Sequence, residues 1–185
     1  FFGFNSSFNG PAGLENFKGE LSGFIEHTLT QKYNGKSAPK LAIVSPTAFE
    51  DVSHIYNAPD AALTNANLSI YTEAMKEVCS KHGVLFIDVF SPSGAVFNAN
   101  KESFTKDGAL LNDKGYQWLA HQLVDGIYGK SAIKNPDHRK LVHAAVNEKN
   151  WCWLNDYKMP NGVQIYGRRG SGKNAPPQNY LDEYK

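Results

Sequence analysis

The sequence predicts an α/β domain in which helices flank a parallel β-sheet. Two short apolar runs, Lys40–Val44 and Val84–Val89, have the composition of buried parallel strands. Each run follows a segment whose apolar residues recur at spacings of three and four, which is the pattern of an amphipathic helix. Strands that alternate with helices along a chain are typical of α/β domains.

The first residues predict a strand end, a loop and a helix. Phe1–Asn5 is apolar, and we interpret it as the end of a buried strand that runs into a loop at residues 6–11. A strand end at this position predicts that another part of the domain precedes Phe1. The helix is expected over about residues 12–33, and its apolar positions are Leu14, Phe17, Leu21, Phe24, Ile25 and Leu29.

A loop and a second helix are expected between the two strands. Phe49–Ala62 is polar and contains Pro59, so we predict a long surface loop there. The helix is expected to end near Lys81-His82-Gly83, because basic residues favour the last turn and glycine favours the position after it. Its apolar positions are Leu68, Tyr71, Met75, Val78 and Cys79.

A third helix is predicted after a tight loop. Asp107-Gly108 is a turn signal, and Asn112 stands at a helix N-cap position before apolar residues at helical spacing, Tyr116, Leu119, Ala120, Leu123 and Ile127. Ligands of parallel sheets bind beyond the carboxyl ends of the strands. We therefore expect the loops at Asn5, Ser45 and Asp107 to surround one depression.

The composition changes after residue 130. Asn135-Pro136-Asp137 predicts a helix start, followed by helix to about Lys149 and then an aromatic cluster of Trp151, Trp153 and Tyr157. The tail Met159–Lys185 is rich in Gly, Pro and Asn. We predict a domain at residues 1–130 and a helical and irregular extension at 131–185 that packs on it.

Composition excludes several classes of function. With 19 basic and 18 acidic residues the net charge is +1, which gives no electrostatic signature for nucleic acid. No apolar run approaches the roughly 18 residues of a membrane span. Cys79 and Cys152 are too few for a disulfide framework, and neither has a metal-ligand partner at suitable spacing. Cys79 is expected to be a small core residue.

One phosphate-binding motif is rejected. Residues 167–173 fit Gly-x-x-x-x-Gly-Lys, but Asn174 stands where a Ser or Thr hydroxyl must reach magnesium. Ala175-Pro176-Pro177 is incompatible with the helix that must follow. We therefore predict no nucleotide, no other cofactor and no metal.

Two blocks of the sequence resemble the SGNH (GDSL-type) hydrolases, and in particular their secreted planctomycete-type members. Residues 107–116, Asp-Gly-Ala-Leu-Leu-Asn-Asp-Lys-Gly-Tyr, resemble the last block of that family, and residues 3–14 resemble its third block, Gly-x-Asn. Further similar segments extend to about Arg169. The resemblance implies a flavodoxin-like fold that is truncated at its N-terminus, because the nucleophilic Ser and the Gly of the second block would lie before Phe1.

The resemblance also implies roles for individual residues. Asp107 matches the catalytic Asp, and Asn5 matches the residue whose amide donates to the oxyanion. Leu110 stands where the family has its catalytic His, and it has no group that accepts a proton. Ser45, after the first strand, is the predicted substrate contact. His27, His82 and His121 are expected to be solvated on helix surfaces or ends, and His54, His138 and His143 are the remaining candidates for a substitute base.

The implied activity is hydrolysis of an acyl ester, including acetyl esters of carbohydrates, with catalysis impaired by Leu110. The alternative is a non-catalytic binding or structural module on the same fold. The expected partners are a small-molecule or carbohydrate ester and the missing N-terminal segment of the same protein. The family also implies a secreted or periplasmic location.

Overall fold

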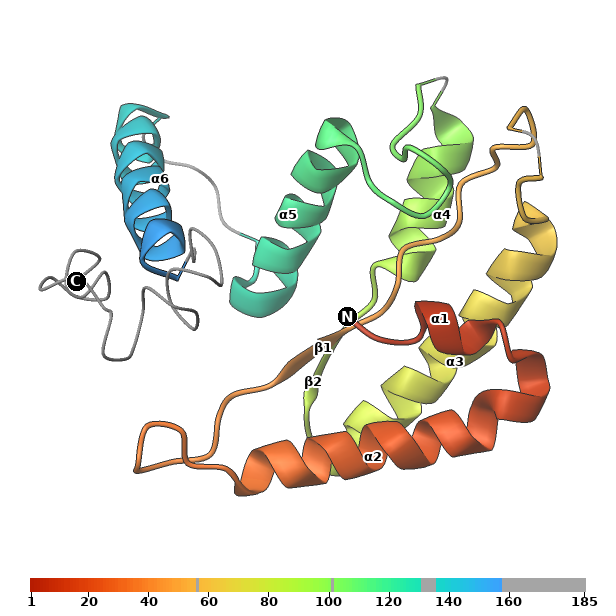
Figure 1. The fold of residues 1–185 in the computed structure, drawn as a ribbon, viewed down its shortest axis with the longest axis horizontal. Coiled ribbons are helices and arrows are strands. Elements are labelled where there is room, and N and C mark those ends of the chain that lie inside the picture. The colour runs from red at the N-terminus through yellow and green to blue at the C-terminus, as the bar shows by residue number, and fades with distance from the viewer. Residues whose placement is uncertain (56, 101, 131–135, 158–185) are drawn as a thin grey trace, which may run out of the picture. The chain divides into compact units, whose positions relative to one another are not determined.

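The computed structural model describes residues 1–55, 57–100, 102–130 and 136–157 (Figure 1). The described part is mixed α/β and mostly helical, and the chain divides into two compact units, Phe1–Ser131 and Ala132–Lys185. The first unit contains, in order, α1 (Phe4–Ser7), the 3₁₀ turn η1 (Gly10–Gly13), α2 (Leu14–Thr30), β1 (Ala42–Val44), α3 (Ala61–His82), β2 (Leu85–Ile87), α4 (Phe90–Ala99) and α5 (Asp113–Tyr128).

The two predicted strands form a parallel sheet. Ala42, Ile43 and Val44 of β1 pair with Leu85, Phe86 and Ile87 of β2. The prediction of an α/β chain with parallel strands is thus confirmed. Within the described residues the sheet has these two strands only.

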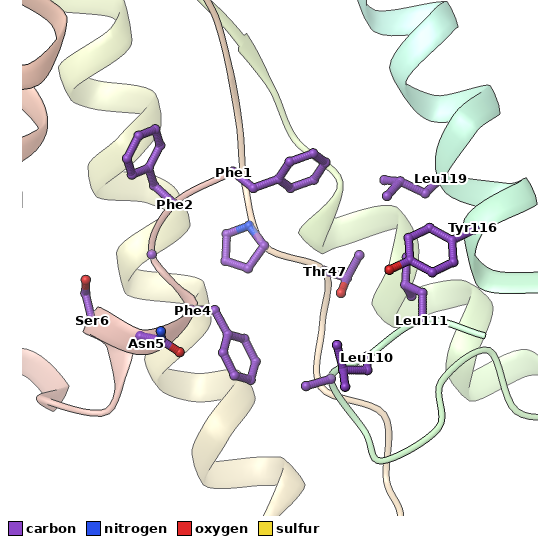
Figure 2. Close-up of a pocket in the computed structure, with 13 residues that line it drawn as sticks. Phe1, Phe2, Phe4, Asn5, Ser6, Thr47, Leu110, Leu111, Tyr116 and Leu119 are labelled. Carbon is purple, nitrogen blue, oxygen red and sulfur yellow. The ribbon is translucent and has the colours of Figure 1, made fainter. Parts of the chain in front are cut away.

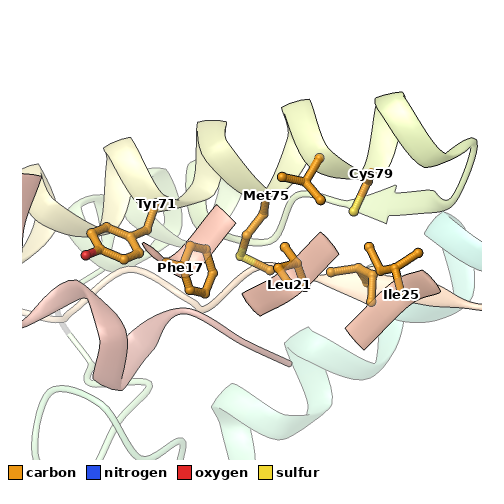
Figure 3. Packing of buried hydrophobic residues seen from close by; sticks show 8 residues of the cluster. Phe17, Leu21, Ile25, Tyr71, Met75 and Cys79 are labelled. Carbon is orange, nitrogen blue, oxygen red and sulfur yellow. The ribbon is translucent and has the colours of Figure 1, made fainter. Parts of the chain in front are cut away.

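Helices cover both faces of this sheet. Successive residues of a strand point to opposite faces, so the apolar residues of the strands are buried on both sides. Ile43 belongs to a cluster with residues of α2 and α3, which lie side by side (Figures 1 and 3). Val44 and Ile87 belong to a second cluster with Phe97 of α4 and Leu119 of α5. The first cluster contains Phe17, Leu21, Ile25, Ile43, Tyr71, Met75, Val78 and Cys79.

Helix termini follow the local sequence signals. The α3 helix begins after Asp60, whose carboxylate accepts a hydrogen bond from Leu63 N at 2.9 Å, and it ends at Gly83 with φ 66°. The α5 helix begins after Asn112, whose side-chain oxygen accepts from Gly115 N at 3.0 Å. The predicted end near Gly83 and the predicted N-cap at Asn112 are therefore confirmed.

The prediction for the first residues is wrong. Phe1 and Phe2 are not in a strand, and the chain turns at Gly3 (φ 96°) into the short helix α1. Phe1 is 63% exposed. A short apolar run does not distinguish a strand from other buried or turning segments, and here the run is interrupted by a glycine. The following helix α2 is also shorter than predicted, because a 3₁₀ turn precedes it and the chain becomes extended at Gln31.

Two further features differ from the expectations. The α4 helix was not predicted: its third residue is Pro92, and proline is tolerated in the first turn of a helix. The loop before α3 is not confined to the surface: Phe49, Glu50 and Val52 are buried. Because this segment has no periodic pattern, the sequence does not indicate which of its residues turn inward.

In the second unit, α6 extends over Pro136–Tyr157. Trp151 and Trp153 lie within this helix rather than after it, and the described side chains at 137–155 are exposed. The tail Met159–Lys185, including the rejected phosphate-binding motif, lies outside the described residues. The expected packing of the extension on the domain stays a prediction.

The α2–α3 interface gives a prediction for stability. Leu21→Ala removes a side chain that is 3% exposed, so we expect the free energy of unfolding to fall by about 2–5 kcal/mol. The matched control is Leu63→Ala, at a position that is 64% exposed, where the change is expected to stay within about 0.5 kcal/mol. Urea unfolding measures both values, and equal losses would contradict the packing.

The two cysteines are expected to differ in reactivity. Burial raises the pKa of the Cys79 thiol to about 11, whereas Cys152 is exposed. Because the thiolate is the reactive form, iodoacetamide at pH 8 should modify Cys152 within minutes and Cys79 only after unfolding. Peptide mass spectrometry of the native and the urea-unfolded protein measures this difference. Rapid native labelling of Cys79 would contradict its placement in the core.

Candidate functional site

The ends of β1 and β2 are joined by the hydroxyl group of Ser45. This hydroxyl accepts hydrogen bonds from Val89 N at 2.9 Å and Phe90 N at 3.0 Å and donates to Pro46 O at 3.1 Å. Ser45 is completely buried, and Ser45 N donates to Ile87 O. A hydroxyl group that accepts two hydrogen bonds and donates one has no donor or lone pair left for a ligand. Ser45 was predicted to contact substrate, but its hydroxyl group instead holds the chain between β1 and the pocket.

A pocket of about 700 Å³ opens directly beyond this junction (Figure 2). Three segments surround it: residues 1–6, Pro46-Thr47, and the loop and helix start that contribute residues 109–111, Tyr116 and Leu119. Most of its wall is apolar, and the side chains of Asn5, Ser6, Thr47 and Tyr116 contribute polar groups. Such a composition is typical of small-molecule sites.

Asn5 lies on this pocket wall in α1. The residue is exposed, and no described residue is hydrogen-bonded to its side-chain amide. Figure 2 shows Phe4 and Asn5 on one side of the pocket, with Leu110, Leu111 and Tyr116 on the other. The amide is thus available as a neutral donor to a ligand.

Leu110 also lines the pocket, whereas Asp107 does not. Asp107 Oδ1 instead accepts hydrogen bonds from Leu110 N at 2.7 Å and Ala109 N at 3.0 Å. These hydrogen bonds lower the pKa of the Asp107 carboxyl group, and the bond from Leu110 N contributes most. Asp107 therefore shapes the turn that presents Leu110, and no described imidazole lies on the pocket wall for it to orient. All three segments expected around one depression contribute to the pocket: Asn5 lines it, the chain after Ser45 contributes Pro46 and Thr47, and the chain after Asp107 contributes residues 109–111.

Glu50 is the residue that sequence analysis missed. Although charged, it is only 8% exposed, and its carboxylate accepts from Ser103 Oγ at 2.6 Å, Phe104 N at 3.0 Å and Thr105 N at 2.8 Å, as well as from Thr105 Oγ1. The only sequence signal is a glutamate between two apolar residues, Phe49 and Val52, in a loop without periodicity.

The charge state of Glu50 follows from these contacts. Burial favours the neutral carboxyl group, but the hydrogen bonds from Ser103, Thr105 and the Phe104 amide outweigh it and lower the pKa. A carboxylate with a lowered pKa stabilises the fold at pH values above its ordinary range. That contribution is lost as the pH falls through the lowered value.

None of the six histidines is among the described residues that line the pocket. His27, His54, His121, His138 and His143 are exposed. The prediction that His82 is solvated is wrong: its side chain is 13% exposed, and Nε2 lies 2.6 Å from Ser22 Oγ, so it joins α3 to α2. Among the described residues of the pocket wall, Tyr116 has the one ionisable side chain.

The described residues hold neither a metal-binding cluster nor a membrane-spanning helix. They contain no group of three His, Cys, Asp or Glu side chains placed to hold a metal ion. Among them, no helix is both long enough and apolar enough to cross a bilayer.

Comparison with known proteins adds no assignment. No family model matches this chain, and no curated protein matches its sequence.

The loop that carries Leu110 gives a prediction. Gly108 has φ 93°, and a Cβ atom there would overlap the ring of Phe49. Gly35 has a similar φ of 72° but no atom within 4 Å of such a Cβ, so Gly35→Ala measures backbone strain alone. We expect Gly35→Ala to cost about 1 kcal/mol and Gly108→Ala at least about 2 kcal/mol more. Thermal unfolding measures both, and equal costs would contradict the Phe49 contact.

Proposed function

We propose that this chain is part of an SGNH hydrolase-like domain with a flavodoxin-like fold, and that its pocket binds an acyl ester with impaired hydrolysis. The observation that carries the proposal is that Asn5 and Leu110 line the same pocket. These residues come from the two sequence blocks that resemble the family, and they lie far apart in the chain. The resemblance also supports the proposal of a secreted or periplasmic location.

The Asn5 amide has the chemistry of an oxyanion donor. When a nucleophile attacks an ester carbonyl, negative charge develops on the oxygen, and a fixed neutral N–H stabilises that charge. In the proposed reaction a Ser from the segment before Phe1 attacks the carbonyl, forms an acyl-enzyme and releases the alcohol. Water then releases the acid.

Leu110 limits this reaction. A Ser hydroxyl must lose its proton as it attacks, and in this family an imidazole accepts it. Leu110 offers only carbon atoms, and no His, Asp or Glu side chain lines the described pocket. Loss of one member of a catalytic triad lowers the rate by about 10⁴–10⁶. Binding of the ester does not depend on this proton transfer.

The pocket wall favours an ester with an apolar acyl group. Phe4, Leu110, Leu111 and Leu119 contribute apolar surface, and Thr47 and Tyr116 contribute hydroxyl groups. A ligand with an apolar acyl part and a polar alcohol or sugar part matches both kinds of group.

A non-catalytic binding module is the second candidate. It is favoured by the same absence of a base from the described pocket. Under this alternative the ester or a related acyl sugar binds and is released unchanged. Kinetics and binding on the same variants distinguish the two candidates.

The test uses the full-length protein and Leu110→His, with Leu110→Gln as a polar control without a base. With 4-nitrophenyl acetate, we expect the wild type to turn over far below the roughly 10 s⁻¹ of typical enzymes. Leu110→His should raise kcat at least about tenfold through general-base catalysis, and Leu110→Gln should not.

Two results would contradict the proposal of an impaired esterase. The first is a wild-type rate near 10 s⁻¹ that Leu110→His leaves unchanged, because another base would then act. The second is no binding of the ester to any of the three proteins. Saturable binding without turnover, even in Leu110→His, would favour the non-catalytic module. Asn5→Ala should weaken turnover, with Asn9→Ala, also exposed and outside the pocket wall, as its control.

A further inference from the structure

We infer that Glu50 is a positioning residue for the pocket: its buried carboxylate fixes the loop Ser103–Leu111, which carries Leu110 and Leu111 on the pocket wall. Glu50 itself does not line the pocket. The inference rests on the proposed function only in treating this pocket as the ligand site.

All described side-chain hydrogen bonds of Glu50 go to the beginning of this loop. The carboxylate accepts from two hydroxyl groups and two backbone N–H groups, all within residues 103–105. Its own backbone N–H donates to Gly108 O at 2.9 Å. A single residue thus holds both the start and the middle of the loop.

Hydrogen bonds within the loop connect the Glu50 carboxylate with the backbone of Leu110. Thr105 Oγ1 donates to Glu50 and accepts from Gly108 N at 3.0 Å. Lys106 N donates to Leu110 O at 2.7 Å, and Thr105 forms an antiparallel bridge with Leu111. Asn112 N also donates to Phe104 O at 2.9 Å and closes the other side of this bridge. Movement of the carboxylate should therefore displace the wall of the pocket.

Glu50 is in turn held by the core. Asn65 on α3 accepts from Phe49 N and donates to Phe49 O, both at 2.8 Å. The Phe49 ring lies directly against Gly108 and leaves no room there for a Cβ atom. The carboxylate is therefore attached to a long, packed helix, which is the rigid support that a positioning residue requires.

The charge of Glu50 strengthens these contacts. Hydrogen bonds to an ionised acceptor are about twice as strong as those between neutral groups. Glu50→Gln keeps the size of the side chain but removes the charge, and it replaces one acceptor oxygen with a donor that faces hydroxyl and N–H groups. The variant should therefore make the loop Ser103–Leu111 more mobile while α2 and α3 stay packed against each other.

The decisive experiment is hydrogen exchange of the full chain, read by mass spectrometry. Glu50→Gln should raise exchange at least about tenfold in peptides that cover residues 103–112 and leave α2 and α3 within about twofold of wild type. Glu20→Gln is the matched control, because this exposed glutamate accepts a hydrogen bond from Asn16 on α2 and has no contact with the loop. It should change neither region.

Thr105→Val provides an independent variant if Glu50→Gln does not fold. It removes the hydroxyl that connects Glu50 with Gly108 and should raise exchange in the same peptides. Unchanged loop exchange in the folded variant would overturn the inference. An equal increase in the loop and in α2 and α3 would also overturn it, because it would show a general loss of stability.

Kinetics with 4-nitrophenyl acetate add a functional readout. In the Leu110→His background, Glu50→Gln should raise KM at least about threefold and lower kcat, whereas Glu20→Gln should alter neither. If the parent variant neither binds nor hydrolyses the ester, the proposed function fails, and the exchange experiment still decides the inference. If the loop is released and both KM and kcat stay unchanged, Glu50 has no positioning role in this site.

Discussion

Adjacent residues of β1 point to opposite faces of the sheet, and the packing of the first unit depends on this alternation. Ile43 contacts the cluster of α2 and α3, and Val44 contacts the cluster of α4 and α5. A strand pair of three residues each has few hydrogen bonds of its own. The burial of both faces therefore stabilises the sheet, and the end of β1 at Ser45 determines where the pocket lies.

Periodic elements of this fold were predictable from the sequence, and irregular ones were not. Helices α2, α3 and α5 and both strands have apolar patterns that report burial on one or two faces. Phe1–Asn5 was misinterpreted because a short apolar run gives no period. The inward position of Glu50 depends on groups at residues 103–105, more than fifty positions away, and local sequence carries no signal for such contacts.

Some of the residues that were singled out for the candidate site line the pocket, and others do not. Resemblance to a family selected Asn5 and Leu110, and both line the pocket. It also selected Asp107, whose carboxylate binds the backbone of its own turn. Ser45 was chosen for its place after a strand, but its hydroxyl is used to join the strand ends. Position along the chain indicated the right region, and only the hydrogen bonds distinguish ligand contacts from structural ones.

The two hydrogen bonds between Asn65 and the backbone of Phe49 limit where this chain tolerates insertions and deletions. Both backbone groups of Phe49 are bound to one helical residue, and Glu50 is bound to residues 103–105 and 108. An insertion between Phe49 and Glu50, or within residues 103–108, would separate the bonded groups and break several hydrogen bonds together. The turn around Asn34, which is exposed and bonded within itself, has no such restriction. Variation in loop length during evolution should therefore accumulate at the turn after α2, while the spacing around Glu50 stays constant.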